Sequence, residues 1–304
     1  MSEINISSSA ALLNQRQLPA FFGHASVWAG WDRTQAWFKH PLSGAEMRQV
    51  LDAGAPQIFS HYGAAIFDIR YTQRLTFMVP TKEAHTLLRD MRDPDDVLVN
   101  LGEPGLSINV PDDALKAHVE AYIDRTWVTR HHAQHRVAHK RGEDGTVTRY
   151  SGPAYAPNVN ALYSYKPCRF TGEVDCVHPD RRIKGAAACR AAGITGFASI
   201  LAFDHQAFWR KHLQLYEMDW SKFGRMFSNQ GLSRKRRGPL TYRSGRFTYD
   251  CDARLGGTLA QRAWQDGSGK TIQQIVDRYH GVLPIKRCLV RVDTEPLLTG
   301  MALY

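Results

Sequence analysis

Residues 160–185, NALYSYKPCRFTGEVDCVHPDRRIKG, bring together side chains that could act on a phosphate. Tyr163 and Tyr165 are two residues apart, so on a strand they would lie on the same side. A tyrosine becomes a useful nucleophile when a nearby lysine, here Lys166, or a metal ion stabilises its phenolate. Carboxylates on a neighbouring strand, such as Asp180, can hold Mg²⁺ or Mn²⁺. This set suits tyrosine attack on a phosphodiester; the alternative is a sheet with partly buried tyrosines and surface acids.

The overall charge favours a polyanionic partner. The chain has 304 residues, with 39 Lys and Arg against 29 Asp and Glu, which gives a formal net charge of +10 and a pI of about 9.5. Neutralising phosphates releases condensed counterions, so such an excess predicts nucleic-acid binding, and a solvated basic surface is the alternative. Five irregularly spaced cysteines without a CxxC motif predict reduced thiols in the cytoplasm. No signal peptide or 18-residue apolar run occurs, so no membrane partner is expected.

Three further motifs invite functional interpretations. The GSGKT segment lacks the glycine that a phosphate-binding loop needs five residues before its Gly-Lys pair, so it is interpreted as a helix start. The histidine-rich segment TRHHAQHRVAHKRG has no acidic residue between its histidines, which disfavours a zinc protease site. We instead expect there a basic face near nucleic acid, formed by His135, Lys140 and Arg141. The run SRKRRG predicts either a solvated surface or phosphate contacts by Arg234, Lys235, Arg236 and Arg237.

The elements that must position these residues indicate an α+β fold, with an antiparallel sheet flanked by helices. Residues 1–18 are interpreted as a flexible tail, 19–232 as the main domain, and 233–304 as a basic linker with a small C-terminal α/β extension. Capping signals and helical spacing predict helices at residues 43–54, 81–91, 112–127, 184–194, 197–218 and 271–281. Alternation predicts strands at residues 21–31, 64–80, 146–152, 158–166 and 173–180, and a hairpin at 240–251. A Pro/Gly/Asp-rich loop is expected over 92–113.

Residues 146–216 carry a resemblance to a known family. A strand with Tyr163 and Lys166 follows a glycine-marked strand, and a later strand carries Asp180 followed by Arg182 and Lys184. This pattern resembles the rolling-circle replication initiation factors of plasmids and the gene II-type replication proteins of filamentous phages. The resemblance implies an enzyme that nicks and rejoins one DNA strand at an origin through a covalent tyrosine–DNA intermediate.

The resemblance also implies roles for particular residues. Tyr163 or Tyr165 would be the nucleophile, because Lys166 is one residue farther from Tyr163 than in the commonest family spacing. Lys166, Arg182 and Lys184 would offset charge on the phosphate. The family uses a divalent metal, so Mg²⁺ or Mn²⁺ would be held by Asp180 and by Asp68 on the polar face of the predicted strand 64–80, with Glu173 or Asp175 as a further ligand.

Two departures from the family pattern bear on this site. Asp180 stands where the family usually has glutamate, and Pro179 before it predicts an edge or bulged strand, because proline has no amide donor. The expected partners are origin DNA, as a single strand or a hairpin, a host helicase and polymerase, and a second copy of the chain in a homodimer. The rival hypotheses are a non-catalytic DNA-binding protein that keeps the fold, and a protein that packages nucleic acid.

Overall fold

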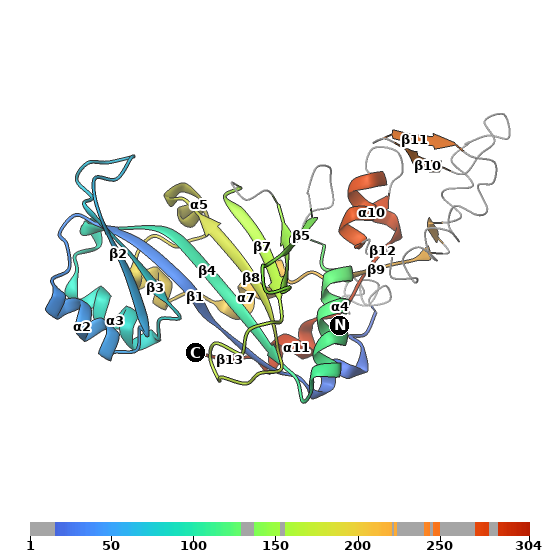
Figure 1. The fold of residues 1–304 in the computed structure, drawn as a ribbon, viewed down its shortest axis with the longest axis horizontal. Coiled ribbons are helices and arrows are strands. Elements are labelled where there is room, and N and C mark those ends of the chain that lie inside the picture. Colours follow the sequence, from blue (N-terminus) through green and yellow to red (C-terminus); the bar gives the residue numbers. More distant parts are fainter. Residues whose placement is uncertain are drawn as a thin grey trace, which may run out of the picture. The chain divides into compact units, whose positions relative to one another are not determined.

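The computed structural model describes residues 16–128, 137–152, 156–220, 222–223, 240–243, 246–249, 271–279 and 285–304. The chain divides into two compact units (Figure 1). The sheet unit consists of residues 21–120, 138–211 and 297–304, and the second unit consists of residues 1–20, 121–137 and 212–296. Over the described ranges, no helix is both long and apolar enough to cross a membrane.

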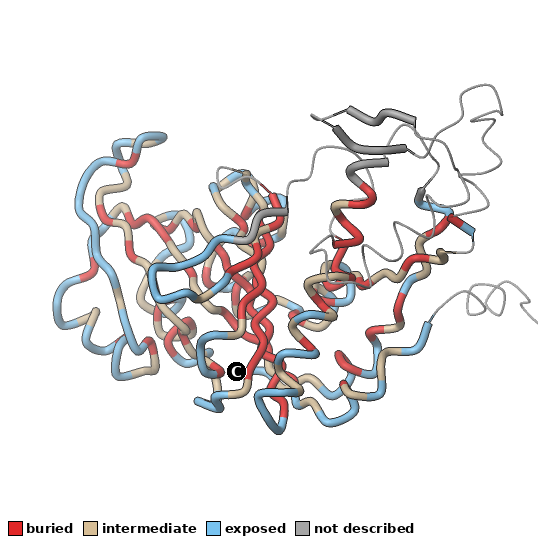
Figure 2. Tube along the Cα trace, turned by 45° about the vertical axis from the view of Figure 1, so that its right-hand side comes forward, coloured by how far each residue is buried: buried red, intermediate tan, exposed pale blue. Residues whose placement is uncertain are grey.

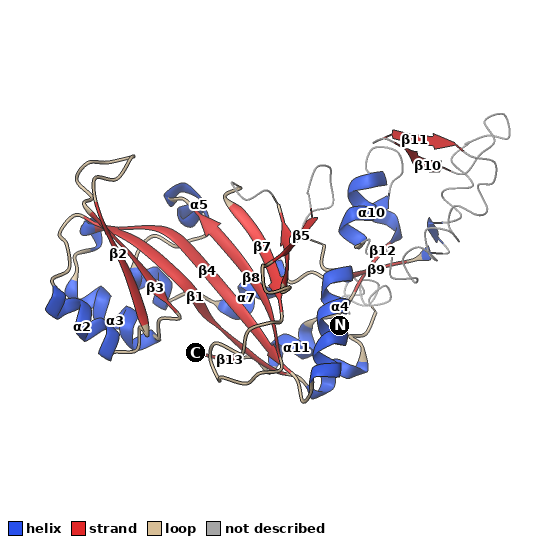
Figure 3. Cartoon of the chain, viewed as in Figure 1, coloured by secondary structure: helices blue, strands red, loops and turns tan. Residues whose placement is uncertain are grey.

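The sheet unit is built on nine strands, and the predicted α+β class with a large antiparallel sheet is confirmed (Figure 3). The spatial order is β2-β3-β1-β4-β8-β7-β6-β5, and β13 pairs in parallel with β1. The strand bounds are β1 Ser26–Phe38, β2 Gln57–Tyr62, β3 Gln73–Met78, β4 Val97–Asn109, β5 Val137–Arg141, β6 Val147–Ser151, β7 Asn158–Tyr163, β8 Cys176–Lys184 and β13 Ala302–Leu303. The long strands β1 and β4 lie at the centre, and Figure 2 shows continuous buried stretches through the middle of the unit.

Helices and the sheet enclose an apolar core. Buried side chains of β1, β3, β4 and β8 pack there with residues from the helices, among them Val50, Leu88, Cys189 and Phe197. The helices are α2 Gly44–Asp52, α3 Lys82–Met91, α4 Asp113–Thr126, α5 Ala186–Ala191, α6 Phe197–Leu201, α7 His205–His212 and α11 Glu295–Thr299, with 3-10 turns η1 Ala20–His24 and η2 Pro94–Asp96. The predicted N-cap of α2 is confirmed, because Ser43 and Glu46 form a reciprocal capping box.

The second unit holds the smaller elements. Strand β9 Tyr216–Met218 pairs with β12 Leu289–Arg291, and the predicted hairpin is present as β10 Leu240–Arg243 with β11 Arg246–Tyr249. Helix α10 Ile272–Tyr279 and the 3-10 turn η3 Ile285–Cys288 contribute to a small core with Met218 and Phe223. The predicted boundary at residue 233 lies outside the described residues and stays a prediction.

Three predicted elements are wrong. The expected loop over 92–113 is largely the 13-residue central strand β4. Its proline, Pro104, pairs opposite Trp31 at a bulge in β1, where a strand tolerates a missing amide donor. The expected strand 64–80 is a turn-rich connection up to Thr72, followed by β3. The expected helix 197–218 is broken into α6 and α7, because the Asp204 carboxylate accepts from the Ala207 amide and begins a new helix.

The position of β8 also differs from expectation. Pro179 predicted an edge or bulged strand, but β8 lies between β4 and β7. Pro179 pairs with Leu162 on β7, while the ladder to β4 passes from Gly105–Asp180 to Ile108–Val177 without a change of register. The strand therefore stays central, because β8 keeps the same register with β4 before and after the proline.

Candidate active site

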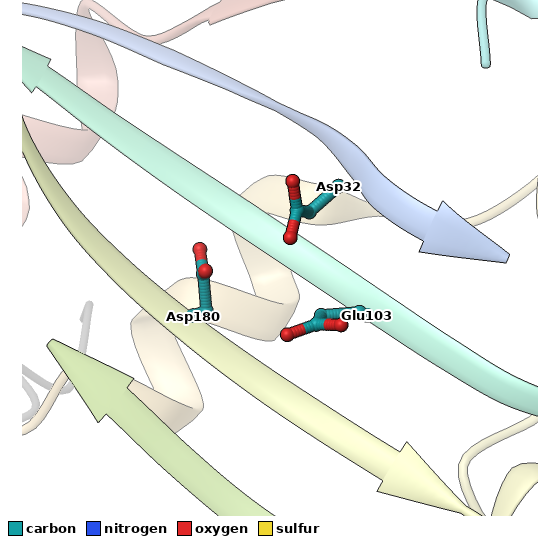
Figure 4. A group of neighbouring side chains, drawn as sticks. All are labelled: Asp32, Glu103 and Asp180. Carbon is teal, nitrogen blue, oxygen red and sulfur yellow. The ribbon is translucent and has the colours of Figure 1, made fainter. Parts of the chain in front are cut away.

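Three carboxylates from three neighbouring strands meet on one face of the sheet (Figure 4). Asp32 lies on β1, Glu103 on β4 and Asp180 on β8, and one oxygen from each lies within 4.8 Å of the other two. Glu103 and Asp180 are fully buried, and the Asp32 side chain is 18% exposed. Three acids so close together repel each other unless cations compensate for their charge.

Irregularities in β1 and β4 bring the acids together. Trp31 pairs with Pro104 and Arg33 with Glu103, so Asp32 is the extra residue of a β-bulge. A bulge re-aims the side chain of the residue it inserts. Gly105 lies between Asp32 and Asp180, and an added Cβ would lie 2.7 Å from Arg169 Nη1 and 3.2 Å from Asp180 Oδ1. The absence of a side chain at residue 105 therefore leaves the space in which the charged groups meet.

Three arginines balance the three acids. Arg33 Nε donates to Glu103 Oε2 at 2.9 Å, and Arg182 Nε donates to the other oxygen of Glu103 at 2.5 Å. Arg169 Nη1 lies 2.6 Å from Asp32 Oδ1, and its Nη2 lies 3.1 Å from Asp180 Oδ2. Arg33 and Arg182 are partly exposed, with side-chain exposures of 29% and 24%. With all three acids ionised, the cluster therefore carries no net charge. It is buried except where Asp32, Arg33 and Arg182 are partly exposed.

Tyr163 brings a hydroxyl into this cluster from the end of β7. Its hydroxyl donates to Asp180 Oδ2 at 2.8 Å and accepts from Arg169 Nη2. The side chain is buried, with 7% of the residue exposed, and its ring stacks on His178 at 4.9 Å between centroids. The Lys166 ammonium lies 5.9 Å from the ring centroids of both Tyr163 and Tyr165. Tyr163 is therefore held in one orientation with its oxygen against an acid and a guanidinium.

Burial and neighbouring charges shift the pKa values of this group. Burial raises the pKa of Asp180 to about 7, although the Arg169 guanidinium opposes the shift. Burial and the Asp180 charge hold the pKa of Tyr163 well above its usual value. Burial also disfavours ionisation of Glu103, but Arg182 and Arg33 prevail and lower its pKa. Near neutral pH, Asp180 is therefore the acid best placed to exchange a proton with the Tyr163 hydroxyl.

The acids form a donor set that fits a divalent cation. Carboxylate oxygens are the ligands that Mg²⁺ and Mn²⁺ prefer. Asp180 Oδ1 is buried and has no hydrogen-bond partner among the residues that the structure describes, which leaves one acceptor available for an ion. Asp32 and Asp180 also pair with Arg169, so an ion would compete with that guanidinium for their oxygens.

The structure brings together only some of the residues predicted from the sequence. Tyr163, Asp180 and Arg182 lie in the cluster, and Lys166 lies at its rim. Tyr165 is 44% exposed, and its hydroxyl accepts from Thr148 Oγ1 at 3.2 Å. It therefore lies beside Tyr163 and does not contact the acids through any described hydrogen bond.

The other predicted ligands lie outside the carboxylate cluster. Asp68 lies in the connection between β2 and β3 and pairs with Arg70 at 2.6 Å. Glu173 lies in the loop after β7, where it accepts hydrogen bonds from Asn109 and Thr171. Lys184 is half-buried at the end of β8, and Lys140 and Arg141 are exposed on β5. His135 and Arg234, Lys235, Arg236 and Arg237 lie outside the described residues.

Sequence reasoning missed Asp32, Glu103, Arg33 and Arg169. Asp32 and Arg33 interrupt an aromatic strand, VWAGWDRTQAWF, and charged residues inside such a strand are the signal that could have identified them. Glu103 was hidden because GEPG is typical of a turn. Arg169 lies in a connecting loop, and no periodicity predicts where its side chain lies.

Comparison with known proteins gives little support for any assignment. No family model matches the chain, and no curated protein matches it. Among solved structures, a rolling circle replication initiator protein from Geobacillus stearothermophilus is similar, with a TM-score of 0.36 and 11% sequence identity. The alignment covers 62% of this chain and 86% of that one. A likeness this distant says nothing about the function of this chain.

Proposed function

We propose that the chain nicks and rejoins one DNA strand through a covalent bond to Tyr163, as a replication initiator of the rolling-circle kind. The observation that carries the proposal is the Tyr163 hydroxyl, hydrogen-bonded to Asp180 beside Asp32 and Glu103. One hydrogen-bond partner is enough to satisfy the hydroxyl of a buried tyrosine. The Tyr163 hydroxyl contacts both a carboxylate and a guanidinium, and two further carboxylates lie nearby. Such a group suits proton removal from a phenol and stabilisation of charge on phosphorus.

The chemistry that these residues would perform is a transesterification. Asp180 takes the proton of the Tyr163 hydroxyl, and the phenolic oxygen forms a bond to the phosphorus of the attacked phosphodiester. The bond from phosphorus to the 3′ oxygen breaks, and that oxygen takes up a proton to become a 3′ hydroxyl. The 5′ phosphate remains on Tyr163. Because the bond energy is stored in the phosphotyrosine, the reverse reaction rejoins the strand without another cofactor.

The surrounding charges would support this step. Arg169 touches the reacting oxygen, and Arg33 and Arg182 lie at the partly exposed side from which a phosphate would approach. A divalent ion, Mg²⁺ or Mn²⁺, would be held by Asp32, Glu103 and Asp180, and it would supply Lewis-acid stabilisation of the phosphate. At the rim, exposed Tyr165 with Lys166 suits stacking and phosphate contact with an unpaired base.

Wider contacts with DNA follow from the charge of the chain. The net charge of +10 and the exposed Lys140 and Arg141 on β5 favour a phosphate backbone as partner. We assign the same role to Lys184, and to His135 and the run 234–237 outside the described residues. Origin DNA, a host helicase and polymerase, a homodimer and a cytoplasmic location belong to this proposal.

A nicking assay tests the proposal. The full chain is incubated with Mg²⁺ or Mn²⁺ and a supercoiled plasmid that carries its own coding region. Open circles and a protein-bound 5′ end are expected from the wild type, from Tyr165→Phe at a similar rate, and not from Tyr163→Phe. A Tyr163→Phe variant that nicks like the wild type would contradict the assignment of the nucleophile.

One observation favours a second candidate, a DNA-binding protein without catalytic activity. The three acids are already matched by three arginines, and such a neutral network can serve only to fix the central strands. Under this hypothesis the chain binds DNA but never forms open circles, and Tyr163→Phe changes stability alone. The nicking assay, run with a filter-binding measurement of DNA affinity, separates the two candidates.

A further inference from the structure

Strand β2 and its connection to β3 expose an unusual number of large apolar side chains. Of the eleven exposed large hydrophobic residues in the described chain, five lie between residues 59 and 69. They are Phe59, Tyr62, Ile66, Phe67 and Ile69, and we call them the apolar tip. Ile66 is fully exposed and Ile69 is 80% exposed. Single exposed hydrophobic residues need no explanation, but a group of them marks a surface that binds something.

The tip is an ordered structure. The Gly63 amide donates to the Thr72 carbonyl, and the Ala65 amide donates to the Tyr71 carbonyl, so the two arms of the connection are tied together. The Phe67 ring meets Trp37 of β1 edge to face at 5.9 Å between centroids. In Figure 1 the connection projects from the end of β2 and β3 that lies away from α2 and α3, and in Figure 2 it is mostly exposed. The apolar side chains are thus presented on a fixed support, which lowers the entropy cost of binding.

The base of the tip is basic. Lys39 lies over the Tyr71 ring at 5.7 Å, and Arg74 lies over the Trp37 ring at 5.4 Å. Arg70 is 70% exposed in its side chain and pairs with Asp68, the one acid between residues 57 and 78. Three cations and one acid therefore surround the base of the apolar tip. This excess of positive charge complements a phosphate backbone. A protein partner that covered the tip would have to bury these cations without phosphates to compensate for their charge.

The tip and the candidate active site are connected through β3, which follows the tip and pairs with β1. The Val79 amide donates to the Asp32 carbonyl at one end of β3, and Gln73 at the other end follows the tip. The six residues of β3 span ~20 Å, at about 3.4 Å per residue. The connection between β2 and β3 begins beyond the far end of β3, so Ile66 and Ile69, which it carries, are separated from Asp32 by at least about this length.

We propose that the apolar tip inserts Ile66 and Ile69 between stacked base pairs of duplex DNA, several base pairs away from the scissile phosphate. Apolar side chains inserted at a base step unstack it and kink the duplex, while the flanking cations hold the phosphates. Flexible pyrimidine–purine steps deform most easily, so the inserted step should be of that type. The tip would thereby help to expose the single strand that Tyr163 attacks, so this inference rests on the proposed function.

A fluorescence experiment tests the insertion. The full chain is mixed with duplexes that carry 2-aminopurine at successive steps, taken from the fragment of its own replicon that it binds most tightly. Wild type should raise the fluorescence several-fold at one or two steps only. The double variant Ile66→Ser/Ile69→Ser should abolish the rise, whereas Val174→Ser, which alters another exposed residue outside the tip, should keep it. An equal rise with the double variant would overturn the proposal.

Nicking of two substrates separates this inference from the proposed function. The double variant should nick a closed duplex at least about tenfold more slowly than wild type, but a pre-opened bubble at the wild-type rate. If wild type unstacks the step but nicks neither substrate, the insertion stands and the proposed function fails. If the double variant nicks both substrates normally and instead turns a dimer into a monomer in sedimentation, the tip is a contact between copies of the chain and the proposal is wrong.

Discussion

The carboxylate cluster and the apolar tip reverse the usual distribution of side chains within one unit. Three acids and three arginines meet where a sheet normally buries hydrocarbon, while five large hydrophobic residues face water on β2 and its connection to β3. Both arrangements cost free energy in the isolated chain, since buried charges lose hydration and exposed hydrocarbon orders water. In the two proposals above, a phosphate with its cation would offset this cost in the cluster, and a base step would offset it at the tip.

The largest effect on the free energy of unfolding is expected from a substitution of Glu103 in the carboxylate cluster. Glu103→Gln removes a buried charge that pairs with both Arg33 and Arg182, so it should lower the free energy of unfolding by about 3–5 kcal/mol. Asp68→Asn is the matched control, because it removes the acid of an exposed ion pair at the tip and should leave the urea midpoint unchanged. If both substitutions lowered the free energy of unfolding equally, the buried charges of the cluster would stabilise the fold no more than an exposed ion pair does.

Metal binding should respond to Arg169. Arg169→Gln removes the guanidinium that pairs with Asp32 and Asp180, so Mn²⁺ should bind about tenfold more tightly, which is about 1.4 kcal/mol. Lys166→Gln removes a nearby cation that pairs with neither acid and is the control. Electron paramagnetic resonance of free Mn²⁺ gives the affinity directly. Weaker binding to Arg169→Gln would show that Arg169 organises the acids and does not compete with the ion.

The pH dependence of activity and of stability should have opposite signs. Asp180 acts as a base only when ionised, and burial raises its pKa, so nicking should rise with pH until Asp180 is ionised. A carboxyl whose pKa is raised on folding stabilises the fold while it is protonated, and this contribution is lost as pH rises through the folded pKa. The difference in unfolding free energy between the wild type and Asp180→Asn should therefore fall from about pH 4 to about pH 7 and stay level above that. A parallel rise of both quantities would contradict the role of Asp180.

The smallest effect is expected at the tip. Ile66→Ser exchanges a fully exposed side chain, so the thermal midpoint of the chain without DNA should match that of the wild type within error. Differential scanning calorimetry checks this expectation, and Leu106→Ser, in the buried core, is the contrasting variant that should lower the midpoint by several degrees. A large loss of stability in Ile66→Ser would show that the tip packs against the protein in solution.

The sequence allowed some parts of this picture to be predicted and hid others. Helices with a capping box, a regular apolar stripe and a glycine end, such as α2, were predicted correctly because their signals are local. Strand β4 was missed because its glycines and proline are typical of turns, while its place depends on pairing with β1 and β8 far along the chain. Long-range pairing overrides local preference in a central strand.

The same contrast between local signals and long-range pairing separates the site residues that were predicted from those that were missed. Tyr163, Asp180 and Arg182 lie within 20 residues of each other on an adjacent pair of strands, and the family resemblance of this short segment was what indicated that they could meet. Asp32 and Glu103 join them only through the strand order β1-β4-β8 and a bulge, neither of which spacing reveals. Asp68 was preferred because alternation placed it on a strand, but that segment forms turns and its carboxylate pairs with Arg70.

The most direct test of the central claim is mass spectrometry of the chain after it has reacted with its replicon DNA and Mn²⁺. We predict a peptide that contains Tyr163 and carries a nucleotide on the tyrosine oxygen, absent when the ion is chelated. An adduct on Tyr165, or complete nicking without any DNA attached to the chain, would contradict the account.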